Sequence, residues 1–228
     1  PGTPMGQGFH DFIDFNVEAE NLGYCATFLT EHHFSGWHQV SATLTLLTFL
    51  AARPPRLRLG TAVMTLPWHN PVILAEQAAT LDLMSDGRLD FGVGKGYRHS
   101  EFHGFRIPPE EAEARFEEAV EIITRSWVTR ERFSHRGRFW QFDDIVVEPP
   151  PAQQPHPPFW YASSSEIGST WAGEHGLHYV TLGPTAMAKA NITSFKSALA
   201  KRGQPAQPKP EFSGGVVIGV QRHIFVAD

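Results

Sequence analysis

The stretch Ala26-Thr27-Phe28-Leu29-Thr30-Glu31-His32-His33-Phe34 places three titratable side chains directly after a short apolar run. The run has the character of a buried strand that ends near Thr30. In a barrel of parallel strands, ligands bind at the carboxyl ends of the strands, so polar residues here favour a site. Packed or capping histidines are the plainer alternative for a single histidine. A glutamate and two adjacent histidines after one strand weigh against that alternative.

Apolar, β-rich runs alternate with helical patterns along the chain, as expected of repeated βα units around a parallel sheet. The predicted strands are Cys25–Thr30, Leu57–Leu66, Leu89–Val93, Phe159–Ala162, His178–Leu182 and Val216–Val226. The predicted helices are Gly8–Leu22, Ser41–Ala52, Val72–Met84, Pro109–Thr129, Ile167–His175 and Thr185–Arg202. Six strands are too few to close an eight-stranded barrel, whose usual length is about 250 residues. We therefore expect an α/β fold, a TIM (β/α)8 barrel that is incomplete in this chain, with the first strand and the C-terminal part missing.

The segment between Phe133 and Pro158 departs from this alternation. It contains aromatic pairs and two proline clusters, Pro149–Pro151 and Pro155–Pro158, which enforce an extended connection. No domain boundary is evident in the sequence. The expectation is a single barrel domain over residues 1–228 with an excursion at about 133–158.

The composition limits the function classes. The chain has 228 residues, a formal net charge of -5 and no cluster of lysines and arginines, which argues against nucleic acid and an anionic membrane surface and favours a small-molecule partner. Its single cysteine, Cys25, lies in an apolar run, where a buried and unreactive thiol in a reducing compartment is expected. No apolar stretch approaches the roughly 18 residues of a membrane span. A cytoplasmic location is expected.

Two further segments could contact a ligand. Gly60, Thr61 and Ala62 are small and would let a flat ligand approach the backbone, although a tight loop packed on small residues explains them at least as well. The run Gly92-Val93-Gly94-Lys95-Gly96 carries one cation that could meet a phosphate. Its glycine spacing is not that of the dinucleotide-binding fingerprint.

A third segment, Ser163-Ser164-Ser165, ends a predicted strand and passes into a helix that includes Gly168. Hydroxyls beside the free N–H groups of a helix N-terminus can bind an anion, as phosphate sites of barrels often do. An ordinary serine N-cap is the commoner explanation. The segment alone leaves both open.

Together and in this order, these segments resemble the bacterial luciferase-like flavin monooxygenases, the family of the alkanal monooxygenase α chain. The resemblance runs from about Glu20 through Asp228. The motifs that carry it are Glu31-His32-His33-Phe34, Leu59–Val63 with Leu66-Pro67 and Pro71-Val72, Leu81-Asp82 with Ser85–Arg88, the Gly92-to-Gly96 run, and Glu101-Phe102 with Phe105.

The resemblance implies roles for matching positions. His32 would be the catalytic histidine, and the family's non-proline cis peptide beneath the flavin ring matches the Ala62–Val63 bond. Lys95 stands where the luciferases place an arginine on the flavin phosphate, which replaces a fork of donors by a point charge. Gly94 stands where they have a reactive cysteine, so cysteine-linked behaviour is not expected. The implied cofactor-binding residues are Glu31, Ala62, Val63, Gly94, Lys95, Ser163, Ser164, Ser165 and Gly168.

The implied chemistry is two-component monooxygenation. Reduced FMN from a separate flavin reductase would react with O2 at C4a, and the resulting C4a-peroxyflavin would oxygenate a small organic substrate. An imidazole can act as acid or base near neutral pH, which suits His32. Phe34, Trp37 and Trp68 could shield the reaction from water. A homodimer is also implied.

Three alternatives remain. F420-dependent oxidoreductases share this superfamily fold, and so do non-catalytic flavin-binding relatives. A metal hydrolase using His32, His33 and His69 is disfavoured because helical H-E-x-x-H spacing is absent and adjacent side chains of an extended segment point to opposite sides. We therefore expect no metal.

Overall fold

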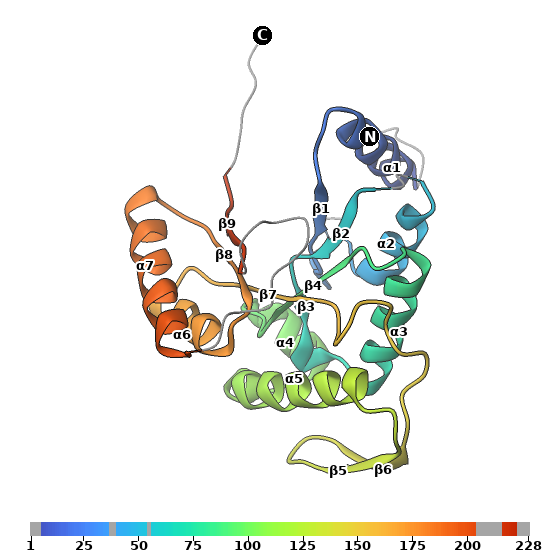
Figure 1. The fold of residues 1–228 in the computed structure, drawn as a ribbon, viewed down its shortest axis with the longest axis vertical. Coiled ribbons are helices and arrows are strands. Elements are labelled where there is room, and N and C mark those ends of the chain that lie inside the picture. Colours follow the sequence, from blue (N-terminus) through green and yellow to red (C-terminus); the bar gives the residue numbers. More distant parts are fainter. Residues whose placement is uncertain (1–5, 37–39, 54–55, 204–215, 223–228) are drawn as a thin grey trace. The chain divides into compact units, whose positions relative to one another are not determined.

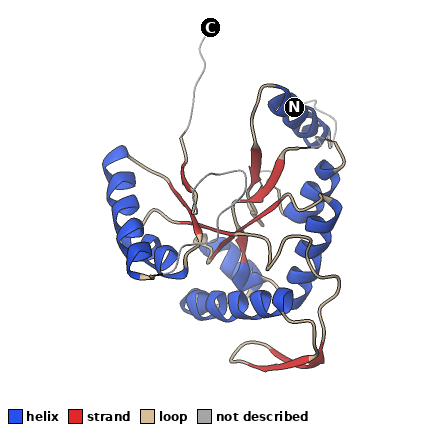
Figure 2. Ribbon diagram, in the orientation of Figure 1, coloured by secondary structure: helices blue, strands red, loops and turns tan. Residues whose placement is uncertain are grey.

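The computed structural model describes residues 6–36, 40–53, 56–203 and 216–222 (Figure 1). The chain divides into two compact units, residues 1–157 and residues 158–228, which we call the N-terminal unit and the C-terminal unit. Each unit contains parallel strands alternating with helices, as the sequence predicts (Figure 2). The expectation of a single domain over residues 1–228 stays a prediction.

The N-terminal unit is built on parallel strands in the order β1-β2-β4, with β3 also parallel to β4. Their bounds are β1 Ala26–Leu29, β2 Arg58–Thr61, β3 Met64–Thr65 and β4 Leu89–Gly94. Every residue of β2 and β4 is buried, which is typical of parallel strands covered on both faces. The predicted strand Leu57–Leu66 is interrupted at Ala62 and Val63, whose peptide bond is cis.

Five helices are described in this unit: α1 Gln7–Asn21, α2 Thr43–Ala51, α3 Pro71–Met84, α4 His99–Phe105 and α5 Ala112–Val128. Two 3-10 turns accompany them, η1 Leu66–Trp68 and η2 Pro109–Glu111. The start of α3 follows from its sequence, since Asn70 caps the N–H groups of Val72 and Ile73 and Pro71 occupies the first turn. The buried stripe of α5 includes Trp127, which donates to the Ala75 carbonyl at 3.0 Å and so ties α5 to α3.

The predicted excursion contains a hairpin of β5 (Phe133–Arg136) and β6 (Gln141–Ile145), which lies alongside α5 in Figure 1. The carboxylate of Glu118, on α5, accepts hydrogen bonds from three consecutive backbone N–H groups of the turn, at positions 138, 139 and 140. The sequence did not predict this hairpin, because it depends on that contact with the preceding helix, which no local pattern reveals.

The C-terminal unit has three parallel strands in the order β7-β8-β9, β7 Phe159–Ala162, β8 His178–Thr181 and β9 Ile218–Val220. Two helices accompany them, α6 Glu166–His175 and α7 Thr185–Lys201. In its core, the Tyr179 and Phe195 rings stack 4.9 Å apart. The predicted continuation of the last strand to Val226 lies partly outside the described residues.

Two details correct the sequence expectations. Cys25 is exposed rather than buried, because it precedes β1, which is an edge strand of the described sheet. The helix α4 was not predicted. No helix among the described residues is long and apolar enough to cross a membrane.

Candidate active site

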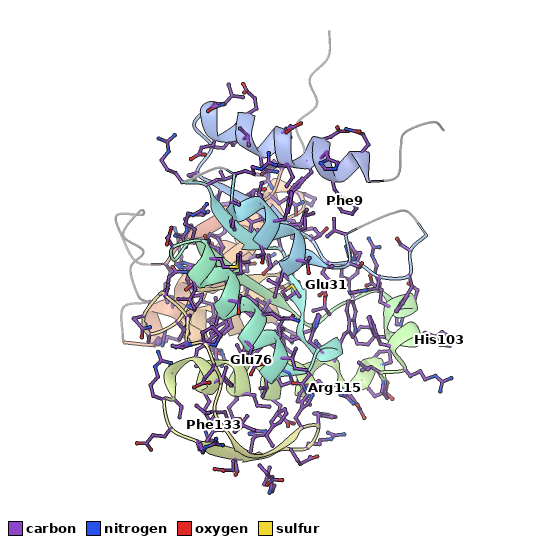
Figure 3. The ribbon with its side chains drawn as sticks, turned by 90° about the vertical axis from the view of Figure 1, so that its right-hand side faces the viewer. Phe9, Glu31, Glu76, His103, Arg115 and Phe133 are labelled. Carbon is purple, nitrogen blue, oxygen red and sulfur yellow. The ribbon has the colours of Figure 1, made fainter. Side chains whose placement is uncertain are left out.

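Glu31 lies just beyond the carboxyl end of β1 and anchors the site. It is 3% exposed and lies in the interior of Figure 3. Its Oε2 accepts the Thr65 backbone N–H at 2.7 Å, and its Oε1 is 2.7 Å from Nε2 of His69 and 3.2 Å from Nε2 of His33. One buried carboxylate therefore joins the segment that follows β1, the end of β3 and the residue that follows η1.

The environment of Glu31 favours its charged form. Burial by itself would raise the pKa of this carboxyl group. The hydrogen bond and charge of His69, together with hydrogen bonds from Thr65 and His33, outweigh burial and hold the pKa below its ordinary value. Glu31 is therefore an anionic acceptor toward which two imidazoles donate.

Glu101, on α4, orients the neighbouring histidine. It is 1% exposed, and its Oε1 lies 3.1 Å from Nδ1 of His32 while accepting the backbone N–H of His33 at 2.7 Å. A carboxylate can only accept, so Nδ1 of His32 carries the hydrogen in this pair. The Nε2 atom of His32 has no hydrogen-bond partner among the described residues. It is available to a reacting molecule.

Aromatic rings surround this pair of histidines. Tyr97 meets the His32 ring edge-on at 6.1 Å, and Trp68 and Phe105 stack 5.3 Å apart beside His33. Phe34 packs on Phe105 at 4.8 Å. The rings proposed to exclude water thus lie at the site, except that Trp37 lies outside the described residues.

The expected cis peptide between Ala62 and Val63 is present. Ala62 is exposed although Thr61 and Met64 on either side are buried, and its N–H donates to the Leu29 carbonyl at 2.8 Å, beside β1. A Cβ at Gly94 would lie 2.5 Å from the Val63 side chain. Val63 therefore occupies the space that a cysteine at position 94 would need.

The predicted phosphate contacts have protein partners of their own. Lys95 pairs with Glu113 at 2.6 Å, on the partly exposed surface of the N-terminal unit. In the C-terminal unit, Ser165 caps α6 by accepting the Gly168 N–H at 3.1 Å, and Ser163 accepts the Ser165 N–H at 3.1 Å. Ser164 is exposed beside them. The N-cap alternative is thus correct, and a phosphate role for these residues stays a prediction.

Sequence reasoning missed the parts that Glu101 and His69 play. Glu101 belonged to a family motif without an assigned role, and His69 was weighed only as a metal ligand. In the structure, His69 and His33 converge on Glu31 rather than on a common empty point. Among the residues that the structure describes, no three His, Cys, Asp or Glu side chains are grouped to hold a metal ion.

Comparisons with known proteins also point to the luciferase-like family. Residues 1–228 match a family model described as luciferase-like monooxygenase. The chain is 28% identical to the oxygenase component of flavin-dependent trigonelline monooxygenase of Acinetobacter baylyi, over 97% of this chain and 60% of the relative. It is 31% identical to F420-dependent glucose-6-phosphate dehydrogenase of Intrasporangium calvum, over 76% of this chain and 54% of the relative.

Among solved structures, the monooxygenase RslO1 from Streptomyces bottropensis matches with a TM-score of 0.83 and 28% identity, over 91% of this chain and 64% of that one. This likeness confirms the expected α/β fold of the TIM-barrel type, of which the chain spans a part. The chain covers between 49% and 60% of the length of the first three curated relatives it matches.

Proposed function

The chain belongs to the luciferase-like monooxygenase family, and we propose that it is a monooxygenase that uses reduced FMN and O2 to oxygenate a small organic substrate. The observation that carries the proposal is the His32–Glu101 pair, which holds an imidazole with one nitrogen available to a reacting molecule. A flavin reductase would supply the reduced cofactor.

The residues present suit a flat cofactor. Ala62 is small and exposed next to the buried Thr61, so a planar ring can approach the backbone there. Glu31 fixes the following strand through the Thr65 N–H and keeps this surface in place. When bound, reduced FMN supplies the electrons that activate O2; the protein contributes binding, orientation and proton transfer.

In this proposal His32 is the catalytic residue and Glu101 a positioning residue. With its Nδ1–H directed to Glu101, the neutral ring presents Nε2 as a proton acceptor, and the carboxylate stabilises the ring when it takes the proton. The rings of Tyr97, Trp68 and Phe105 limit access of water to the same side. Lys95 and the serines at 163–165 keep the phosphate role that the family resemblance implies as predictions.

The test is an anaerobic titration of the protein with reduced FMN and, separately, with reduced F420, followed by mixing with air. We expect reduced FMN to bind more tightly and its complex to consume O2. Preference for F420 without O2 consumption would instead indicate a hydride-transferring oxidoreductase, the second candidate, which the likeness to an F420-dependent dehydrogenase favours. Binding of neither cofactor would contradict both and favour a non-catalytic relative.

The role of His32 has its own test. His32→Gln should leave the affinity for reduced FMN unchanged within a few-fold, while the O2-dependent turnover of the complex falls about a hundredfold or more, the usual effect of losing a general acid or base. His10→Gln, which removes an exposed histidine of α1, is the matched control and should have no effect. Full turnover by His32→Gln would refute the assignment. The homodimer and the cytoplasmic location remain predictions from the sequence.

A further inference from the structure

The helix α4 has two chemically different sides. Glu101 and Phe105 face the candidate active site, where they contact His32 and Trp68. His99 and His103 are four residues apart and therefore share another side of the helix, and Arg106 directly follows its last residue. Figure 3 shows His103 at the outer side of this helix. The second side has no part in the proposed function.

That side borders an open cavity of about 520 Å³, within the size range of small-ligand pockets. Phe102, Ile107 and the prolines at 108 and 109 form its apolar walls, and the three basic residues form its polar part. None of the described residues that line the cavity is acidic. Its chemistry is that of a positively charged edge on an apolar surface.

The three basic side chains are not engaged elsewhere. Within the described part of the chain, the side chains of His99, His103 and Arg106 make no hydrogen bond or ion pair. The nearby carboxylate of Glu111 is already paired with Arg115 at 2.8 Å. The positive charge at the cavity is therefore not neutralised by that acid.

The backbone conformation of Arg106 is one that another residue type would adopt with less strain. It ends α4 in the left-handed conformation, with φ 56°, a position that favours glycine or asparagine. The chain keeps an arginine there in spite of the backbone strain, and its guanidinium borders the cavity. A guanidinium presents paired N–H donors that match the two oxygens of a carboxylate or a phosphate.

We propose that this cavity binds a small organic anion, a carboxylate or phosphate ester with a short apolar body. Arg106 would hold the anionic group, with His99 and His103 as further donors, and Phe102 and Ile107 would cover the apolar body. Phe102 also meets the Trp68 ring at 5.8 Å. Because α4 carries Glu101 as well, an occupant of the cavity would act on the helix that orients His32.

The test is isothermal titration calorimetry of the protein with benzoate and with phenyl phosphate, using neutral benzyl alcohol as the matched uncharged probe. It requires no flavin and no turnover, so it is independent of the proposed monooxygenase activity. We expect at least one anion to bind, about tenfold more tightly than benzyl alcohol or better, and to bind more weakly as ionic strength rises. The preferred anion identifies the head group.

Substitutions then locate the site. Arg106→Gln should weaken binding of the anion about tenfold or more, and His103→Gln by a smaller factor. Arg138→Gln removes the same charge from the hairpin and is the control that should change nothing. The proposal is overturned if neither anion binds, if benzyl alcohol binds equally well, or if Arg106→Gln binds like the unaltered protein or no differently from the Arg138→Gln control.

Discussion

The two ends of the parallel strands in the N-terminal unit carry different polar clusters. The amino-end cluster consists of Arg58, Asp82, Arg88, Asp90 and Gln153, and the carboxyl-end cluster consists of Glu31, His32, His33, His69 and Glu101. At the amino end, Arg58 pairs with Asp90 at 2.7 Å, and Gln153 donates twice to Asp82, at 2.8 and 2.7 Å. Both clusters are extensively hydrogen-bonded, yet they differ in how far their side chains are accessible to a ligand.

At the amino end, the charged groups are fixed. Arg58 and Asp90 are 6% and 1% exposed, and the Arg88 guanidinium is held by the carbonyls of Ala51 and Leu57. At the carboxyl end, buried carboxylates hold imidazoles that are themselves partly exposed, 13% for the His32 side chain and 26% for that of His69. In a closed, buried ion pair each charge compensates the other, whereas a held but accessible imidazole can transfer a proton.

The strongest way to break the amino-end cluster is Asp90→Ala. It leaves Arg58 buried without its carboxylate, and such a loss typically costs about 3–5 kcal/mol in the free energy of unfolding. Urea unfolding at neutral pH measures the effect. Flavin binding by the protein that remains folded should change little, because Asp90 does not contact the carboxyl-end cluster.

The matched control replaces both partners. Arg58→Met together with Asp90→Leu removes the charges as a pair, and such exchanges are often neutral or stabilising. We expect the double variant to recover most of the stability lost in Asp90→Ala. A double variant no more stable than the single one would mean that Arg58 matters mainly for its bonds to the Leu89 carbonyl and Gln153.

The corresponding change at the carboxyl end, Glu101→Gln, should act on turnover rather than on stability. Glutamine can still accept the His33 N–H, but it no longer stabilises a protonated His32 ring. We expect O2-dependent turnover to fall about tenfold, equivalent to roughly 1.4 kcal/mol.

A spectroscopic signature separates positioning from a general structural defect. Long-range proton–nitrogen NMR of the imidazoles should show the neutral His32 ring carrying its proton on Nδ1 in the unaltered protein. In Glu101→Gln this preference should weaken. Glu101→Asp keeps the charge and should retain more of the turnover and more of the NMR preference than Glu101→Gln. Unchanged turnover and an unchanged NMR preference in Glu101→Gln would show that Glu101 does not orient His32.

The same contrast explains what the sequence predicted and what it missed. Strands such as β4 and β8 follow from buried apolar runs, which a local pattern reveals. Glu31 and His32 came from a motif within one segment. The pairing of His32 with Glu101 joins residues 69 positions apart, and it exists only because α4 packs beside the end of β1. With seven residues, α4 is too short for a helical period to be visible, so neither the helix nor its carboxylate could be placed.

The smallest expected effect is on the pH dependence of the free energy of unfolding, which should differ between the amino and carboxyl ends of the strands. His156 follows Gln153 in the segment bound at the amino end, stacks on Trp127 and directs Nδ1 to the Pro157 carbonyl at 2.7 Å. Burial lowers the pKa of His156 below its ordinary 6.5, so the unfolded chain takes up this proton more readily than the folded one. The free energy of unfolding should therefore fall as pH decreases from about 6.5 toward the lower folded-state pKa.

At the carboxyl end the window is different, because the lowered pKa of Glu31 means that its contribution is lost only as pH falls below its ordinary value of 4.5. His156→Phe keeps an aromatic ring beside Trp127 and should flatten the dependence of stability on pH in the upper window. Glu31→Gln should leave the pH dependence below about 6.5 intact and alter the one below 4.5. Urea midpoints measured from neutral to acidic pH test both, and an equally steep upper window in His156→Phe would assign that proton to another histidine. In that case no group at the amino end would contribute to the pH dependence of stability, and only the carboxyl-end cluster would titrate.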